Sequence, residues 1–209
     1  MDTKLSKESK LGYGLGGCAI VLRLLSDSVF SSGGPLWFQL IQAALLVAAV
    51  FVMRNHLSRI YLTGGNNKPG VRMALSVVPI ALALSIGFAL FRYGTIILPS
   101  AQTWIILVGN NLFFPLVEEL EFRGYLLSAF TTAGLNGKWA NLLVASIHTF
   151  VHAHYFFQGN ITTIVLTFVI FLWLGNIVLK TKSLLGAWVG HASYNIILFT
   201  FLIGFGYNR

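Results

Sequence analysis

The sequence predicts an all-α protein, a polytopic bundle of transmembrane helices that forms a single membrane domain over residues 1–209. Three observations predict this class: 56% of the residues are hydrophobic, only 10% are charged, and the mean hydropathy is +0.77. Soluble domains usually carry about 25% charged residues, so too few polar side chains remain here to cover a globular core. Several apolar stretches also approach the roughly 20 residues that a membrane-spanning helix needs.

Apolar segments separated by glycine, proline or charge predict about seven spans, or eight if one of the breaks hides a further span. The first segment contains Arg23 and Asp27, whose four-residue spacing allows them to pair on one helix face. The same segment equally suits a helix that lies in the membrane interface. The seven predicted ranges are 11–30, 35–53, 73–91, 103–129, 139–157, 161–179 and 183–204.

Lysine and arginine gather in the loops on one side of the predicted bundle, which indicates a multi-pass protein of the cell (plasma) membrane with a cytoplasmic N-terminus. These residues suit anionic lipid headgroups, and no basic patch with interleaved aromatic residues indicates nucleic-acid binding. A single cysteine, Cys18, excludes an internal disulfide and a cysteine-based zinc site. The residues placed inside are Lys4, Lys7, Lys10, Arg54, Arg59, Lys68, Arg72, Lys138, Lys180 and Lys182, against Arg92 and Arg209 outside.

Half of the six acidic residues lie in one segment of the fourth span, VEELEFRGYL at 117–126. A carboxylate at membrane depth costs at least a few kcal/mol, so it should face the bundle interior and have a partner. Glu119 and Arg123 share a helix face, whereas Glu118 points about 100° away. This spacing predicts that Arg123 neutralises and orients Glu119, which leaves Glu118 to take a proton. A purely structural ion pair is the alternative, and the spacing assigns no role to Glu121.

Four of the five histidines lie in predicted spans downstream of these glutamates. His148, His152 and His154 belong to SIHTFVHAHYF, and His191 precedes Asn195 by one turn in GAWVGHASYNIILF. Glutamate, histidine and amide groups are those that activate water and hold an oxyanion. They would also suit zinc, but the HExxH spacing is missing, so a metal site ranks second.

Three motifs in order resemble those of the CPBP family, the CAAX-prenyl endopeptidases and bacteriocin-processing or immunity proteins that are also called Abi proteins. They are Glu118-Glu119-x-x-x-Arg123, Phe150-x-x-x-His154 and His191-x-x-x-Asn195. The resemblance covers about residues 114–199, which we take as the catalytic core. It implies a glutamate-dependent intramembrane endopeptidase that needs no metal.

The resemblance also implies a role for each motif residue. Glu118 and the histidine of the second motif, His154, polarise the attacking water, and Glu119 with Arg123 supports them. His191 and Asn195 stabilise the oxyanion of the tetrahedral intermediate.

The depths of the histidines disagree with this pattern. At about 1.5 Å per helical residue, His154 lies about 24 Å from Lys138, whereas His191 lies only about 14 Å from Lys182. Either the turn at 131–138 dips into the membrane, or another histidine of the fifth span acts. His154 alone satisfies Phe-x-x-x-His; the alternatives are His152 and His148, which share a helix face.

The sequence therefore predicts an enzyme, a CPBP-type membrane protease that hydrolyses a bond in a peptide or membrane-protein substrate. CAAX-type processing, bacteriocin maturation and self-immunity all fit the motifs. Two other classes compete with this prediction: a non-catalytic immunity or scaffold protein that binds a partner, and an ion-coupled transporter. A transporter normally shows repeated halves, whereas most of the intramembrane polar groups here gather in one half.

Overall fold

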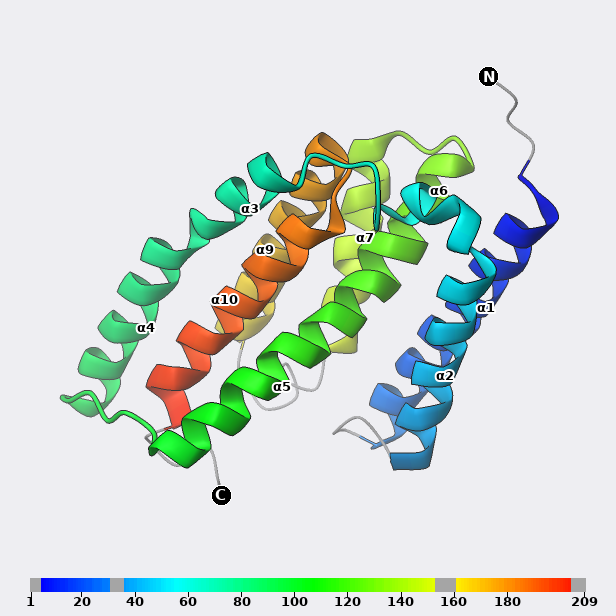
Figure 1. Ribbon diagram of the computed structural model, residues 1–209. Coiled ribbons are helices and arrows are strands. Elements are labelled where there is room, and N and C mark those ends of the chain that lie inside the picture. The colour runs from blue at the N-terminus through cyan, green and yellow to red at the C-terminus, as the bar shows by residue number, and fades with distance from the viewer. Residues whose placement is uncertain (1–4, 31–35, 153–160, 204–209) are drawn as a thin grey trace.

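The computed structural model describes residues 5–30, 36–152 and 161–203, which form helices joined by turns and contain no strand (Figure 1). This arrangement confirms the predicted all-α bundle. The helices are α1 (Lys7–Phe30), α2 (Leu36–Val52), the 3-10 helix η1 (Arg54–Ile60), α3 (Asn67–Leu75), α4 (Val77–Tyr93), α5 (Ala101–Glu119), the π-helix η2 (Leu120–Leu127), α6 (Ser128–Thr132), α7 (Gly137–Val151), α9 (Ile161–Thr181) and α10 (Leu184–Ile203).

Three continuous helical segments of the described residues are long and apolar enough to cross a membrane: Asn67–Tyr93, Ile161–Thr181 and Leu184–Phe201. Trp37–Val52 and Arg54–Ile60 add a fourth candidate if this pair, bent by 107°, forms one span. The membrane character of the chain thus follows from its helices. The predicted count of seven spans stays a prediction, since α7 has only 15 residues.

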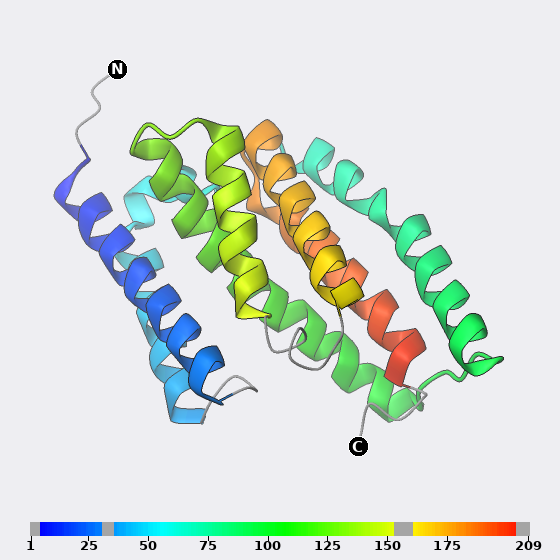
Figure 2. The same ribbon diagram turned by 180° about the vertical axis from the view of Figure 1, so that it is seen from behind.

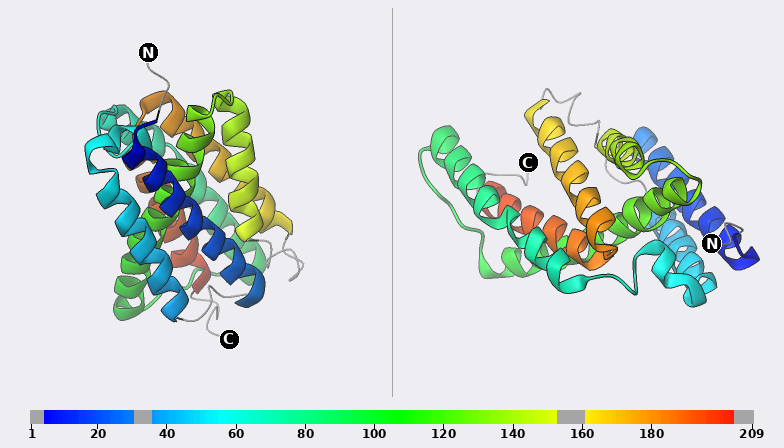
Figure 3. Two further views of the ribbon diagram at one scale, coloured as in Figure 1. Left: turned by 90° about the vertical axis from the view of Figure 1, so that its right-hand side faces the viewer. Right: turned by 90° about the horizontal axis from the view of Figure 1, so that it is seen from above.

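Helix α10 is the central element of the bundle, because it contacts α3, α4, α5 and α9 (Figures 1 and 2). The α1–α2 hairpin lies at one flank, and α4 lies at the opposite flank when the molecule is seen from above (Figure 3). Glycines allow α10 to approach α3 closely: a Cβ atom added to Gly186 would lie 2.7 Å from the carbonyl carbon of Gly70.

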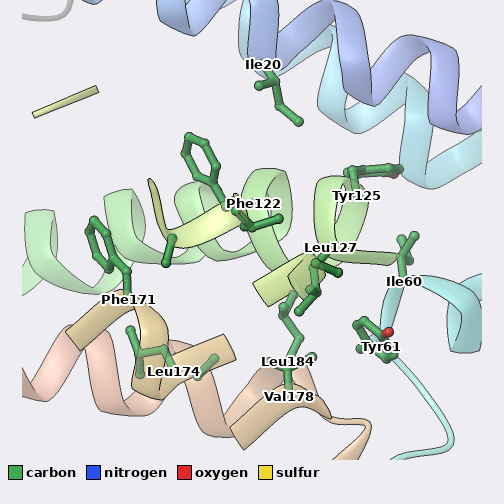
Figure 4. Packing of buried hydrophobic residues seen from close by; sticks show 14 of the residues in the cluster. Ile20, Ile60, Tyr61, Phe122, Tyr125, Leu127, Phe171, Leu174, Val178 and Leu184 are labelled. Atoms are coloured by element: carbon green, nitrogen blue, oxygen red, sulfur yellow. The ribbon is translucent and has the colours of Figure 1, made fainter. Parts of the chain in front are cut away.

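The buried core surrounds η2, where side chains from distant segments meet (Figure 4). Phe122, Tyr125 and Leu127 of η2 are at most 1% exposed. The outer faces of the helices are also apolar, and Phe91 is 90% exposed. A buried core with apolar outer faces is the pattern expected of helices that contact lipid.

Helix α5 continues without a turn into η2, whose backbone is π-helical from Leu120 onward. Pro115 lies inside α5, one turn before this change, and it has no N–H group to bond the preceding turn. A π-helical turn is rare and frequently lies at a functional site. Here it directly follows Glu118 and Glu119, so the geometry of the motif differs from the regular α-helix that we expected.

Candidate active site

Glu118 and Glu119 end helix α5 at the point where α1, α7 and α10 supply partners for their side chains. Glu118 is 8% exposed, and Glu119, Glu121 and Arg123 are fully buried. A run of acidic residues in an apolar helix is stable only when it faces other polar groups. The contacts below show that each of these glutamates has such a partner.

Glu119 and Arg123 form the ion pair predicted from their four-residue spacing, with Arg123 Nη1 3.1 Å from Glu119 Oε1. The same oxygen lies 2.8 Å from His191 Nδ1. Arg123 Nη2 donates to the carbonyl oxygen of Phe171 at 2.8 Å, and the guanidinium lies over the Phe171 ring. Arg123 is therefore fixed by several contacts, as a buried cation requires.

Glu118 also pairs with a cation. The spacing within its own helix had predicted an ion pair for Glu119 only. Arg23 Nη2 of α1 donates to Glu118 Oε1 at 2.8 Å. The predicted partner of Arg23 was Asp27, whose side chain lies outside the described residues. The other oxygen, Glu118 Oε2, lies 3.4 Å from His148 Nε2 and 3.7 Å from His191 Nε2.

Of the described histidines of the fifth predicted span, His148 lies beside Glu118. Its ring is fully buried and stacked between those of Phe122 and Phe171, with centroids 3.9 and 3.5 Å away. Its Nδ1 lies 2.6 Å from Arg123 Nη1. His148 follows Lys138 by ten residues, about 15 Å of helix, so its depth agrees with that of His191.

The other two histidines of this span stand differently. His152 caps the C-terminal end of α7, and its Nδ1 lies 3.2 Å from the His148 carbonyl oxygen. His154, the residue chosen by the Phe-x-x-x-His pattern, lies outside the described residues. Phe150, which opens that pattern, is 65% exposed on the outer face of α7.

Asn195 is partly buried on α10, one turn after His191. Its predicted role at the oxyanion stays a prediction. Glu121 accepts a hydrogen bond from Gln42 Nε2 of α2, a partner that sequence reasoning missed. Both side chains are buried, so this carboxyl group lies inside the bundle.

The hydrogen-bond partners assign the proton positions of the two histidines. An arginine only donates, so His148 Nδ1 accepts, and the neutral ring carries its proton on Nε2. The carboxylate of Glu119 accepts, so His191 Nδ1 donates, and in the neutral ring His191 Nε2 keeps a lone pair. Glu118 Oε2 therefore faces one donor, on His148, and one acceptor, on His191.

Within the described part of the chain, no three His, Cys, Asp or Glu side chains are arranged as ligands of one metal ion. His154, one of the residues considered for zinc, lies outside that part.

The fold and site define a class, an all-α membrane protein with a buried glutamate, histidine and arginine cluster. Residues 99–197, just under half of the chain, match a protein family described as Rce1-like, type II CAAX prenyl endopeptidase. This match confirms the resemblance to the CPBP/CAAX protease family, and it includes Glu118, Glu119, Arg123, His148 and His191. A comparison with curated proteins and one with solved structures each gave no match.

Proposed function

We propose that this protein is an intramembrane endopeptidase that cleaves a CAAX-type substrate with water activated by Glu118. One observation carries the proposal: Glu118 Oε2 lies 3.4 Å from His148 Nε2 and 3.7 Å from His191 Nε2. A carboxylate oxygen between two imidazoles is suited to take a proton from water. The site lies within the segment that matches the CAAX endopeptidase family.

In this mechanism the attacking water donates one hydrogen bond to Glu118 Oε2 and the other to His191 Nε2. Its oxygen lone pair then points toward the scissile carbonyl carbon. As the C–O bond forms, Glu118 takes one proton of the water. Collapse of the tetrahedral intermediate breaks the C–N bond, and Glu118 gives this proton to the leaving amine.

His148 serves as the donor to the developing oxyanion in this proposal, because its proton is on Nε2. A single oxyanion donor typically contributes a factor of about 10² to 10³ in rate. The assignment differs from the roles implied by the family resemblance, in which the histidine of the second motif polarises water and His191 holds the oxyanion. The reason is the tautomer of each ring, which Arg123 imposes on His148 and Glu119 imposes on His191.

Glu119 and Arg123 hold the two histidines rather than touch the substrate. Arg123 keeps His148 Nδ1 an acceptor, and Glu119 keeps His191 Nδ1 a donor. Such outer partners fix both the tautomer and the orientation of an imidazole. The two residues thus support catalysis through the rings that they orient.

The proposed substrate is a peptide or protein that carries a prenylated CAAX-type C-terminus, as the description of the matching family suggests. A lipid-modified chain end would reach the site from the membrane, where the apolar helices of this protein reside. Bacteriocin maturation and self-immunity stay hypotheses that the motifs allow. The cytoplasmic position of the N-terminus also stays a prediction.

The test is cleavage of a prenylated CAAX peptide by the purified protein in detergent, with the unprenylated peptide beside it. We expect Glu118→Gln to lower kcat/KM by a factor of at least about 10², the lower end for a lost general base. Glu8→Gln, the same change at an exposed residue of α1, is the matched control and should leave cleavage unchanged. A strong chelator should have no effect.

Other outcomes point to other functions. Cleavage lost with the chelator would indicate a metal-dependent hydrolysis. Cleavage that survives Glu118→Gln would rule out this carboxylate as the base. An absence of cleavage by the unaltered protein would favour the partner-binding alternative, a non-catalytic immunity or scaffold protein.

A further inference from the structure

Arg23 is a charged residue of α1 that contacts the site from outside the family-matched segment. It lies 95 residues before Glu118, and its Nη2 atom donates to Glu118 Oε1 at 2.8 Å. The match to the endopeptidase family begins only at residue 99. The known motif residues therefore do not include the arginine that holds the proposed base.

The two oxygens of Glu118 face different groups. Oε1 faces Arg23, and Oε2 faces the Nε2 atoms of His148 and His191. A carboxylate on a long, flexible side chain has no intrinsic reason to present one oxygen to the histidines. The contact with Arg23 removes this freedom, and holding a reactive group in position is a major part of catalysis.

The charges around Glu118 show why this arginine matters. Among the described residues, its charged or titratable neighbours are Arg23 from α1, Glu119 and Arg123 on its own continuous helix, His148 and His152 from α7, and His191 from α10. Arg123 pairs with Glu119, and Glu119 itself adds a negative charge next to Glu118. Arg23 is thus the arginine or lysine of the described residues that directly contacts the proposed base.

We propose that Arg23 is a positioning residue for peptide hydrolysis, which holds Glu118 Oε1 so that Oε2 faces the two histidines. This inference rests on the proposed function. Its consequence is that the N-terminal hairpin forms part of the active site. Helix α1 would then be required for activity as well as for the packing of the bundle.

The experiment compares Arg23→Gln, Arg23→Lys and the matched control Lys10→Gln, which removes an exposed positive charge from the same helix. The measurement is kcat/KM as a function of pH for the CAAX peptide. We expect Arg23→Gln to lose about 10- to 100-fold at neutral pH and to move the acidic limb of the profile to higher pH, because a nearby cation favours an ionised carboxylate. Arg23→Lys should keep much of the kcat/KM and leave the acidic limb close to its original pH. Lys10→Gln should change neither kcat/KM nor the acidic limb.

A merely structural role would lower the yield of folded protein and the total rate without moving the acidic limb, and this result would overturn the proposal. A rise in activity in Arg23→Gln would also overturn it, because Arg23 would then restrain the base. If the unaltered protein shows no Glu118-dependent cleavage, the proposed function fails, and this role fails with it.

A second measurement tests the contact independently of activity. Melting temperatures are compared in detergent for Arg23→Gln, Glu118→Gln and the double variant. If the two side chains pair in the folded protein, the loss in the double variant should be clearly smaller than the sum of the two single losses. Additive losses would overturn the ion pair and therefore the positioning role.

Discussion

The N-terminal helices α1 and α2 and the C-terminal helices α5 to α10 contribute to one buried charge cluster in different ways. The described residues of the C-terminal part supply the family motif, three buried carboxylates, Glu118, Glu119 and Glu121, and one buried arginine, Arg123. The N-terminal part carries no motif. It nevertheless supplies Arg23 to Glu118 and Gln42 to Glu121.

This difference shows that the C-terminal part, the motif half of the chain, does not supply all the hydrogen-bond and ion-pair partners of its own buried polar groups. Arg123 is already committed to Glu119, His148 and the Phe171 carbonyl. Buried carboxylates need donors or cations nearby, and α1 and α2 provide them. The two parts of the chain therefore form one electrostatic unit.

The largest effect should follow Arg123→Ala, within the motif half. The change leaves the Glu119 carboxylate without its buried cation, so we expect the free energy of unfolding to fall by about 3–5 kcal/mol. Denaturant unfolding in detergent measures this loss. Arg72→Ala, at an exposed arginine of α3, is the control and should stay within about 0.5 kcal/mol. A loss below about 1 kcal/mol for Arg123→Ala would mean that the motif half tolerates unpaired charge.

The next effect separates the two histidines proposed for the second motif. We expect His148→Ala to lower kcat/KM by a factor of about 10² to 10³, because it removes the proposed oxyanion donor. His154→Ala should retain most of the cleavage. Both variants need a melting temperature close to that of the unaltered protein for the comparison to be valid. The reverse ranking would support the assignment from the Phe-x-x-x-His pattern instead.

The sequence was most informative where partners lie close along one helix. The spacing of Glu119 and Arg123 predicted their ion pair correctly, because neighbours four residues apart share a face. The mismatch in histidine depths also pointed to His148 as an alternative to His154. Both inferences needed only the rise and the period of a helix.

The partners from α1 and α2 could not be predicted in this way. Arg23 was paired with Asp27 because sequence spacing reveals only local neighbours, whereas its contact with Glu118 depends on how α1 packs against η2. Gln42 was overlooked because one amide in an apolar helix carries no distinctive pattern. The π-helical backbone of η2 also has no recognised sequence signal. The backbone hydrogen-bond pattern after Glu119 therefore could not be predicted from the sequence.

A smaller effect should come from the contact between α3 and α10, where Gly70 and Gly186 bring the two backbones close together. We expect Gly186→Ala to destabilise the protein by about 1–3 kcal/mol, since the added Cβ would lie 2.7 Å from the Gly70 backbone. Gly14→Ala is the matched control: apart from the backbone of its own helix, no heavy atom lies within 4 Å of its added Cβ. It should be neutral or stabilise α1 by up to about 1 kcal/mol. Equal effects at the two sites would argue against a close α3–α10 contact.

The smallest effect should follow Glu121→Gln, the same chemical change as Glu118→Gln three residues earlier. Gln42 Nε2 donates to Glu121 Oε1, and a glutamine at position 121 keeps a carbonyl oxygen that accepts this hydrogen bond. We expect unfolding to change by no more than about 1 kcal/mol and CAAX-peptide cleavage to stay unchanged. Gln42→Leu, which removes the donor, should destabilise by more. A loss of cleavage in Glu121→Gln would mean that α2, like α1, serves the reaction. Unchanged cleavage would limit the contribution of the N-terminal hairpin to the contact between Arg23 and Glu118.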